Sequence, residues 1–126
     1  MDDAGRVLLV RKRGTHSWMQ PGGKVEPGEH PADTLARELH EELGLDLEVS
    51  NFEHWGRFHA AAANEVNHVV DCDMFEVSFA HIAPQLPLSV AAEIEELMWL
   101  DPAAAHTIVI APLSLEHVFP RLADRD

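Results

Sequence analysis

Residues 23–45 are GKVEPGEHPADTLARELHEELGL, and the second half of this stretch predicts a helix that begins at Pro31. Proline suits the first helical position because its fixed φ angle and missing N–H cost nothing there. Asp33 lies in the first turn, where a negative charge interacts favourably with the helix dipole. Gly44 followed by Leu45 predicts a left-handed helix end with an apolar closing contact. The stretch therefore predicts one helix that ends just before Gly44.

Two faces of this predicted helix differ sharply in character. The apolar residues at helical spacing are Ala32, Leu35, Ala36, Leu39 and Leu43. Away from them, Glu38, Glu41 and Glu42 cluster on another face. Each exposed like-charge pair at these spacings costs about 0.2–0.5 kcal/mol, and Arg37 alone cannot neutralise three carboxylates. A divalent ion that prefers oxygen ligands, Mg²⁺ or Mn²⁺, would offset the repulsion. The alternative, a solvated acidic face, is the ordinary explanation of an isolated Glu-x-x-Glu-Glu.

Composition limits the partners of this chain. Its 126 residues fit a single domain, and we expect one domain over residues 1–126. With 9 Lys and Arg against 22 Asp and Glu, the formal net charge is −13. A charge this negative repels a phosphate backbone, so we expect no nucleic-acid polymer as partner. An anionic small-molecule substrate would then need a bound cation to hold it.

The remaining signals predict the compartment. Cys72 is the only cysteine, which excludes an internal disulfide and fits a reducing environment. Met1-Asp2-Asp3 has neither the basic flank nor the apolar run of a signal peptide. No apolar run approaches the roughly 20 residues of a membrane span. We therefore expect a cytoplasmic protein without membrane contact.

Outside the helix, the sequence alternates between strand and turn signals. We expect strands at residues 6–11, 17–20, 47–58, 67–79 and 95–100, and a second helix at residues 112–122. Pro120 is expected to end or kink that second helix. Strands interleaved with two helices predict a layered α/β domain.

The stretch that begins at Gly23 also resembles the Nudix box: Gly, five residues, Glu, seven residues, Arg-Glu-apolar-any-Glu-Glu-any-Gly-apolar. The seven fixed places are filled by Gly23, Glu29, Arg37, Glu38, Glu41, Glu42 and Gly44. At a usage of about one in fifteen per residue type, such a match arises by chance roughly once in 10⁸ positions. The order of strand, turn, box and later strands is similar to this superfamily over most of the chain.

The resemblance implies a fold and a set of site residues. The fold would be a Nudix-like α/β/α sandwich with a mixed central β-sheet. The metal ligands would be the backbone carbonyl of Gly22 and the carboxylates of Glu38, Glu41 and Glu42, with Glu41 and Arg37 also counted among the catalytic residues. Glu29 and Arg37 would form an ion pair that orients the loop on the helix. Gly23 and Gly44 would permit backbone shapes that a side chain obstructs.

Six further positions are candidates outside the box. Glu93 or Glu96 would supply an extra ligand or the general base, with simple surface charge as the alternative. Arg11 and Arg13 lie on the same face of a predicted strand, where they either meet phosphates or protect a sheet edge.

Trp18 would stack on a base or pack in the core, and large aromatic residues in small domains are more often in the core. Glu65 either contacts substrate or belongs to an ordinary solvated loop.

The sequence departs from the family at its start. Nudix domains usually begin with a strand before the one expected at residues 6–11, and here only Met1 to Gly5 precede it. Either the start lies upstream or the sheet lacks one member. In the second case, an exposed strand edge would favour a homodimer or a poorly stable monomer.

The leading functional hypothesis is a metal-dependent hydrolase that acts on a nucleoside diphosphate linked to another group. A MutT-like conversion of a nucleoside triphosphate to a monophosphate and pyrophosphate comes first. Dinucleoside polyphosphates, nucleotide sugars and ADP-ribose are the alternatives. A non-catalytic nucleotide-sensing Nudix module is a second class of hypothesis, although such a module is expected to lose carboxylates that this box retains.

Overall fold

The computed structural model describes residues 1–22, 27–61, 67, 69–112 and 114–120. Its helices and strands are β1 (Val7–Lys12), α1 (Pro31–Leu43), β2 (Phe52–Ala61), β3 (Val69–Val77), α2 (Phe79–Ile82) and β4 (Ile94–Leu100). Short 3₁₀ turns occur at Val49–Asn51, Ala83–Gln85 and Pro102–Thr107, and a π-helical turn at Ser114–Val118.

The strands form two antiparallel pairs. In the first pair, β1 runs beside β4 with Val7 opposite Leu100; in the second, β2 runs beside β3 with Phe52 opposite Val77. The strand expected at residues 17–20 consists of two bridges. Met19 pairs with β1 in the antiparallel sense, and Trp18 pairs with Ile110 in the parallel sense. Both pairings of β1 are therefore antiparallel, and the parallel bridge lies one step away, between Trp18 and Ile110.

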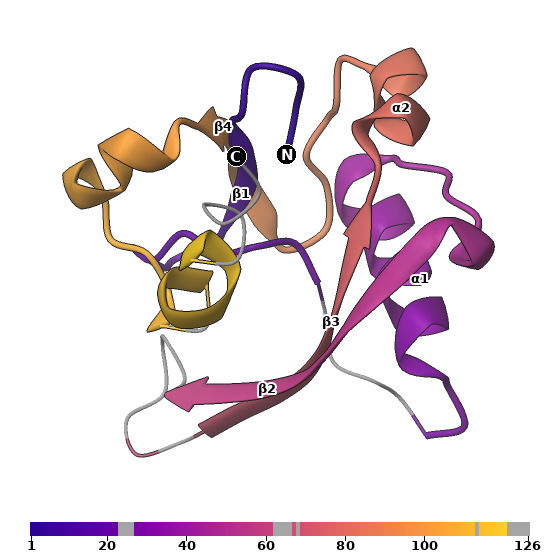
Figure 1. Ribbon diagram of the computed structural model, residues 1–126, viewed down its shortest axis with the longest axis horizontal. Helices are drawn as coiled ribbons and strands as arrows, with labels where there is room; N and C mark the ends of the chain where they lie inside the picture. The colour runs from indigo at the N-terminus through magenta and orange to yellow at the C-terminus, as the bar shows by residue number, and fades with distance from the viewer. Residues whose placement is uncertain (23–26, 62–66, 68, 113, 121–126) are drawn as a thin grey trace.

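Side-chain alternation along β1 builds a core on each of its faces. Val7 and Leu9 belong to a buried cluster with Val118 and Phe119, near the C-terminal turns. Val10 belongs to a second cluster, which contains Leu39, Leu43 and Leu45 from the α1 region. Figure 1 shows the resulting layers, with α1 on one side of β1 and β4 and the yellow helical turn on the other. The α/β fold class is confirmed, and β1 lies between β4 and the bridge to Met19.

Helix α1 begins and ends where its sequence signals predict. Pro31 is its first residue, and Gly44 follows it in the left-handed region at φ 70°. The Gly44 N–H donates to the carbonyl of His40, and the Leu45 N–H donates to that of Leu39. Leu45 itself is buried against the helix end. This confirms the predicted helix end and turns the chain back along α1.

Replacing Gly44 with alanine should destabilise the fold by about 1 kcal/mol, because a Cβ disfavours the left-handed conformation. The space itself is adequate, since the nearest atom to an added Cβ would be Ser89 Oγ at 3.6 Å. Urea unfolding of the two proteins measures the difference. Equal midpoints would show that the left-handed residue carries no strain.

Other predicted elements differ in their bounds. The strand expected from residue 47 begins at Phe52, because Val49–Asn51 forms a 3₁₀ turn. In the described part of the helix expected at residues 112–122, the π-helical turn places Ser114 in the interior, where its hydroxyl hydrogen-bonds Gln20. Within the described residues, no strand precedes β1, and no helix has the length and apolarity to cross a bilayer.

Candidate metal centre

Three carboxylates from two parts of the chain meet at one place. Glu38 and Glu42 lie one turn apart on α1, and Glu93 lies just before β4. One oxygen of each lies within 4.8 Å of the others. We call these three residues the carboxylate cluster. Its spacing and all-oxygen chemistry fit a hard divalent ion.

Glu42 is the member of the carboxylate cluster whose environment is least favourable to a carboxylate. It is 2% exposed, and neither of its carboxylate oxygens has a hydrogen-bond partner in the described part of the chain. Burial raises the pKa of Glu42 to about 8, and the charges of Glu38 and Glu93 add to this effect. A buried carboxylate without donors is costly in the metal-free fold, and a bound cation would supply the missing partner.

Backbone hydrogen bonds hold Glu93 at the carboxylate cluster. The Ala91 N–H donates to the carbonyl of Glu42 at 2.9 Å, and the Arg13 N–H donates to the carbonyl of Glu93 at 2.8 Å. Between them, Ala92 adopts a positive φ of 54°. The segment that carries Glu93 is therefore fixed to both α1 and the end of β1.

A β-bulge in β4 gives Glu93 and Glu96 different surroundings. The sequence alone could not predict which of the two would reach the carboxylate cluster. Arg11 pairs with Glu96 but Lys12 pairs with Ile94, so Glu95 is an extra residue in β4. The guanidinium of Arg11 lies 2.6 Å from Glu96 and 3.4 Å from Glu95. Of the two alternatives, Glu93 reaches the carboxylate cluster, whereas Glu96 is held by Arg11.

The structure contains the ion pair that the box implies between Glu29 and Arg37. Two guanidinium nitrogens of Arg37 donate to the two oxygens of Glu29, each at 3.0 Å. Glu29 also accepts a hydrogen bond from the buried hydroxyl of Thr34 at 3.0 Å. Arg37 lies 3.0 Å from Glu38 as well. The pair therefore joins the loop before α1 to a member of the carboxylate cluster.

Replacing Arg37 with lysine should lower the unfolding free energy by about 1 kcal/mol, because a lysine retains the charge but loses the two-point contact with Glu29. We expect the affinity for Mg²⁺ to fall at least about tenfold, because Glu38 loses its fixed neighbour. Thermal melting and calorimetric titration with Mg²⁺ measure the two effects.

Arg6→Lys is the matched control, since Arg6 makes an ion pair with Asp2 just before β1, whereas Lys12 and the carboxylate cluster lie at the other end of that strand. If both variants lost Mg²⁺ affinity equally, the Glu29 contact would have no special role.

Glu41 does not join the carboxylate cluster. Glu42 lies four residues after Glu38, whereas Glu41 lies four residues after Arg37 and contacts its guanidinium at 3.5 Å. The side chain of Glu41 is about half exposed. Its role as a ligand or catalytic residue stays a prediction.

The other candidates have varied surroundings. Trp18 is buried in the core with Arg11 over its ring at 5.9 Å, which favours the packing interpretation. Arg13 is exposed, and its Nε approaches the carbonyl of Ala92 at 3.4 Å. Gly22 precedes the part of the loop that is not described. The candidates Gly23 and Glu65 lie outside the described residues.

Lys12 is a neighbour of the carboxylate cluster that sequence analysis passed over. Its ammonium lies 3.4 Å from Glu93, and its charge lowers the pKa of Glu42 against the larger effect of burial. Strand alternation places Lys12 on the opposite face of the strand from Arg11 and Arg13. The sequence prediction considered only the face of the two arginines and therefore missed Lys12.

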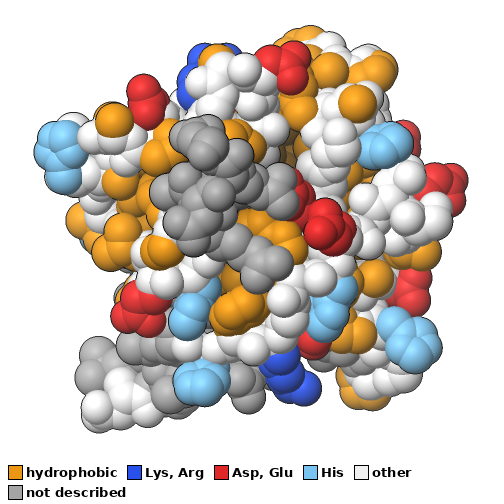
Figure 2. Space-filling view, in the orientation of Figure 1, with side chains coloured by type: hydrophobic (Ala, Val, Ile, Leu, Met, Phe, Trp, Pro, Cys, Tyr) orange, Lys and Arg blue, Asp and Glu red, His pale blue; other side chains and the backbone are white. Residues whose placement is uncertain are grey.

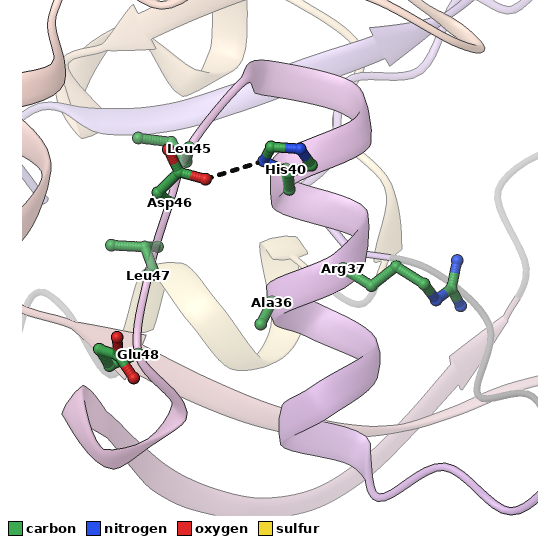
Figure 3. Close-up of a pocket in the computed structure, with 7 residues that line it drawn as sticks. All are labelled: Ala36, Arg37, His40, Leu45, Asp46, Leu47 and Glu48. Carbon is green, nitrogen blue, oxygen red and sulfur yellow. Dashed lines mark ion pairs between the residues drawn. The ribbon is translucent and has the colours of Figure 1, made fainter.

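A separate groove lies between α1 and residues 45–48. Figure 3 shows His40 directed toward Asp46 across it, at 3.0 Å, while the side chain of Arg37 points away from it. Ala36, Leu45 and Leu47 contribute apolar surface.

On the face seen in Figure 2, histidines are spread out and basic patches are few. Neither the groove beside α1 nor the histidines on this face add ligands to the carboxylate cluster.

Comparison with known proteins places this geometry in a family. The family model of the NUDIX domain matches residues 1–122. The chain belongs to the Nudix family. Its fold is similar to the solution structure of the E. coli ORF135 protein, with a TM-score of 0.66 and 25% identity over 98% of this chain and 86% of that one. It is also similar to a MutT/nudix family protein from Enterococcus faecalis, with a TM-score of 0.70 and 21% identity over 97% and 57% of the two chains.

Curated relatives match this Nudix chain over a shorter region. A protein named RNA pyrophosphohydrolase from Pseudoalteromonas translucida is 46% identical over 61 residues. These residues are 45% of this chain and 36% of that protein. A protein of the same name from Photorhabdus laumondii is 51% identical over 41 residues, or 32% of this chain and 23% of that protein. The match therefore spans about a third or less of the relatives' length.

Proposed function

We propose that this Nudix chain is a divalent-metal-dependent pyrophosphohydrolase that cleaves a nucleoside diphosphate linked to another group. The preferred substrate in this proposal is a nucleoside triphosphate, with a monophosphate and pyrophosphate as products. The observation that carries the proposal is the buried Glu42 carboxylate, which has no hydrogen-bond partner among the described residues and lies beside Glu38 and Glu93.

The residues present fit Mg²⁺ or Mn²⁺. In the proposal, Glu38, Glu42 and Glu93 hold the ion, and the carbonyl of Gly22 is a further ligand. When bound, such an ion neutralises phosphate oxygens and lowers the pKa of coordinated water.

The protein's own side chains would hold the site in shape and accept a proton at this centre. The Glu29–Arg37 pair keeps Glu38 in the carboxylate cluster, and the hydrogen bonds at Ala91 and Glu93 keep the β4 side of the site in place. Glu41 is the side chain in this proposal that accepts a proton from the attacking water, because it is exposed and outside the carboxylate cluster. A rigid site of this kind reduces the reorganisation needed in phosphoryl transfer.

A second candidate substrate is an RNA that ends in a 5′ triphosphate. The name RNA pyrophosphohydrolase carried by several curated relatives favours it. The net charge of −13 opposes it, because the polymer adds repelling phosphates that a mononucleotide lacks. We therefore rank a nucleoside triphosphate above a 5′-triphosphorylated RNA as the proposed substrate.

A hydrolysis panel tests the proposal. It contains the ribo- and deoxyribonucleoside triphosphates, a dinucleoside polyphosphate, a nucleotide sugar, ADP-ribose and a short 5′-triphosphorylated RNA, each with Mg²⁺ and with EDTA. We expect Mg²⁺-dependent release of pyrophosphate from at least one triphosphate, with ¹⁸O from labelled water in one product. Melting shifts with nucleotides but no turnover of any panel member would favour a sensing module instead.

The proposed setting is the cytoplasm, on the ground of the single cysteine, Cys72. A homodimer remains part of the proposal because, among the described strands, β4 pairs only with β1 and its other edge has no strand partner. Light scattering tests it, and a stable monodisperse monomer would contradict it.

A further inference from the structure

Lys12 places a positive charge beside the carboxylate cluster. It is the last residue of β1, and its Nζ lies 3.4 Å from Oε1 of Glu93. Its attraction also acts on the buried Glu42. The lysine side chain is about one-third exposed, so its ammonium stands at the border between the cluster and solvent.

The three consecutive cations at the end of β1 have different partners. Arg11 pairs with Glu95 and Glu96 on the bulged strand β4. The side chain of Arg13 approaches the carbonyl of Ala92. Among the cationic side chains whose ion pairs the structure describes, Lys12 is the one that contacts Glu93. Its charge therefore acts on the carboxylate cluster rather than on the general acidic surface.

We propose that Lys12 is the internal counter-ion of the metal-free carboxylate cluster and competes with a divalent ion for its negative charge. This inference rests on the proposed function, in which the carboxylate cluster holds that ion. Lys12 stabilises the metal-free fold by reducing the mutual repulsion of the three carboxylates, and for the same reason it weakens metal binding.

The alternative role, in which Lys12 merely holds Glu93 in place, predicts the opposite sign. If Lys12 positioned a ligand, its removal would weaken metal binding. The backbone around Glu93 is already fixed by the hydrogen bonds from Arg13 to Glu93 and from Ala91 to Glu42. Loss of the lysine therefore leaves the segment anchored, and the change in charge decides the outcome.

The test is calorimetric titration of the whole protein with Mg²⁺ alone at pH 8.5, for the wild type, Lys12→Gln, Lys12→Arg and Arg57→Gln. Arg57 is the matched control, because it is exposed on β2 in the other strand pair and its replacement removes the same charge. We expect Lys12→Gln to bind Mg²⁺ about three- to thirtyfold more tightly at low ionic strength, with the difference shrinking as salt is added. Lys12→Arg and Arg57→Gln should stay within about twofold of the wild type.

Thermal melting provides a second readout. Without metal, Lys12→Gln should melt at a lower temperature than the wild type. Saturating Mg²⁺ should raise the melting temperature of Lys12→Gln by more than it raises that of the wild type. In the Glu93→Gln background, the same lysine substitution should change the Mg²⁺ affinity less, because part of the charge it opposes is gone. Lys12→Met gives the same comparison if the glutamine variant fails to fold.

The outcomes separate the two proposals. A wild type that binds Mg²⁺ and a Lys12→Gln variant that binds it equally or more weakly would overturn the role of Lys12 and leave the metal centre standing. Absence of saturable Mg²⁺ binding by the wild type would overturn both.

Discussion

Replacing Glu42 with glutamine should stabilise the metal-free protein and abolish its response to Mg²⁺. Folding at neutral pH requires the buried Glu42 carboxyl to take up a proton, because it has no hydrogen-bond partner among the described residues, and glutamine removes this requirement while keeping nearly the same shape. With a folded-state pKa of about 8 against an ordinary value of 4.5, we expect a gain of about 2–3 kcal/mol at pH 7. Because a neutral amide is a poor ligand for Mg²⁺, hydrolysis should fall by at least about a hundredfold.

The measurement is thermal melting with and without Mg²⁺, combined with the rate on the best substrate of the panel. Glu48→Gln is the control, since Glu48 is exposed and lies after α1, outside the carboxylate cluster. An enzyme that was less stable after the Glu42 substitution, or that still gained stability from Mg²⁺, would contradict the assignment of Glu42 as a metal ligand.

The stability of the metal-free protein should decrease as the pH rises from about 5 to about 8 through the contribution of Glu42. Burial raises the folded-state pKa of this group to about 8. The folded state therefore binds more protons than the unfolded state in this range. The stabilising contribution is fully present below the unfolded-state pKa and is lost as the pH passes through the folded-state pKa. The expected loss is about 3–4 kcal/mol.

The difference between the wild type and Glu42→Gln isolates this contribution, because other carboxylates titrate in both proteins. Urea unfolding at a series of pH values in EDTA measures it. Mg²⁺ affinity of the wild type should increase over the same range, since metal binding displaces the proton from Glu42. Parallel stability curves for the two proteins would show that Glu42 is not responsible.

Local signals in the sequence were sufficient for α1 and its ends. Pro31, Gly44 and Leu45 act through backbone conformation within one or two turns, so the predicted helix agrees with the structure. The contact between Glu29 and Arg37 is also close in the chain, and the box implied it. Family membership followed from the same short stretch.

These local signals could not predict which residues far apart in the chain would meet in the fold. Period-2 alternation could not choose between Glu93 and Glu96, because the bulge at Glu95 interrupts it and depends on pairing with β1. Helical spacing grouped Glu41 with Glu38 and Glu42, but it could not show that Glu93 would occupy the third place in the carboxylate cluster. That place depends on the tertiary fold, as does the position of Lys12.

The most direct test of the metal centre is a crystal structure of the protein grown with Mn²⁺, with an anomalous difference map calculated at the manganese edge. We predict a peak about 2.0–2.3 Å from carboxylate oxygens of Glu38 and Glu42, with Glu93 at the same ion. An empty carboxylate cluster at saturating Mn²⁺, with Glu42 still buried and without a partner, would contradict the account.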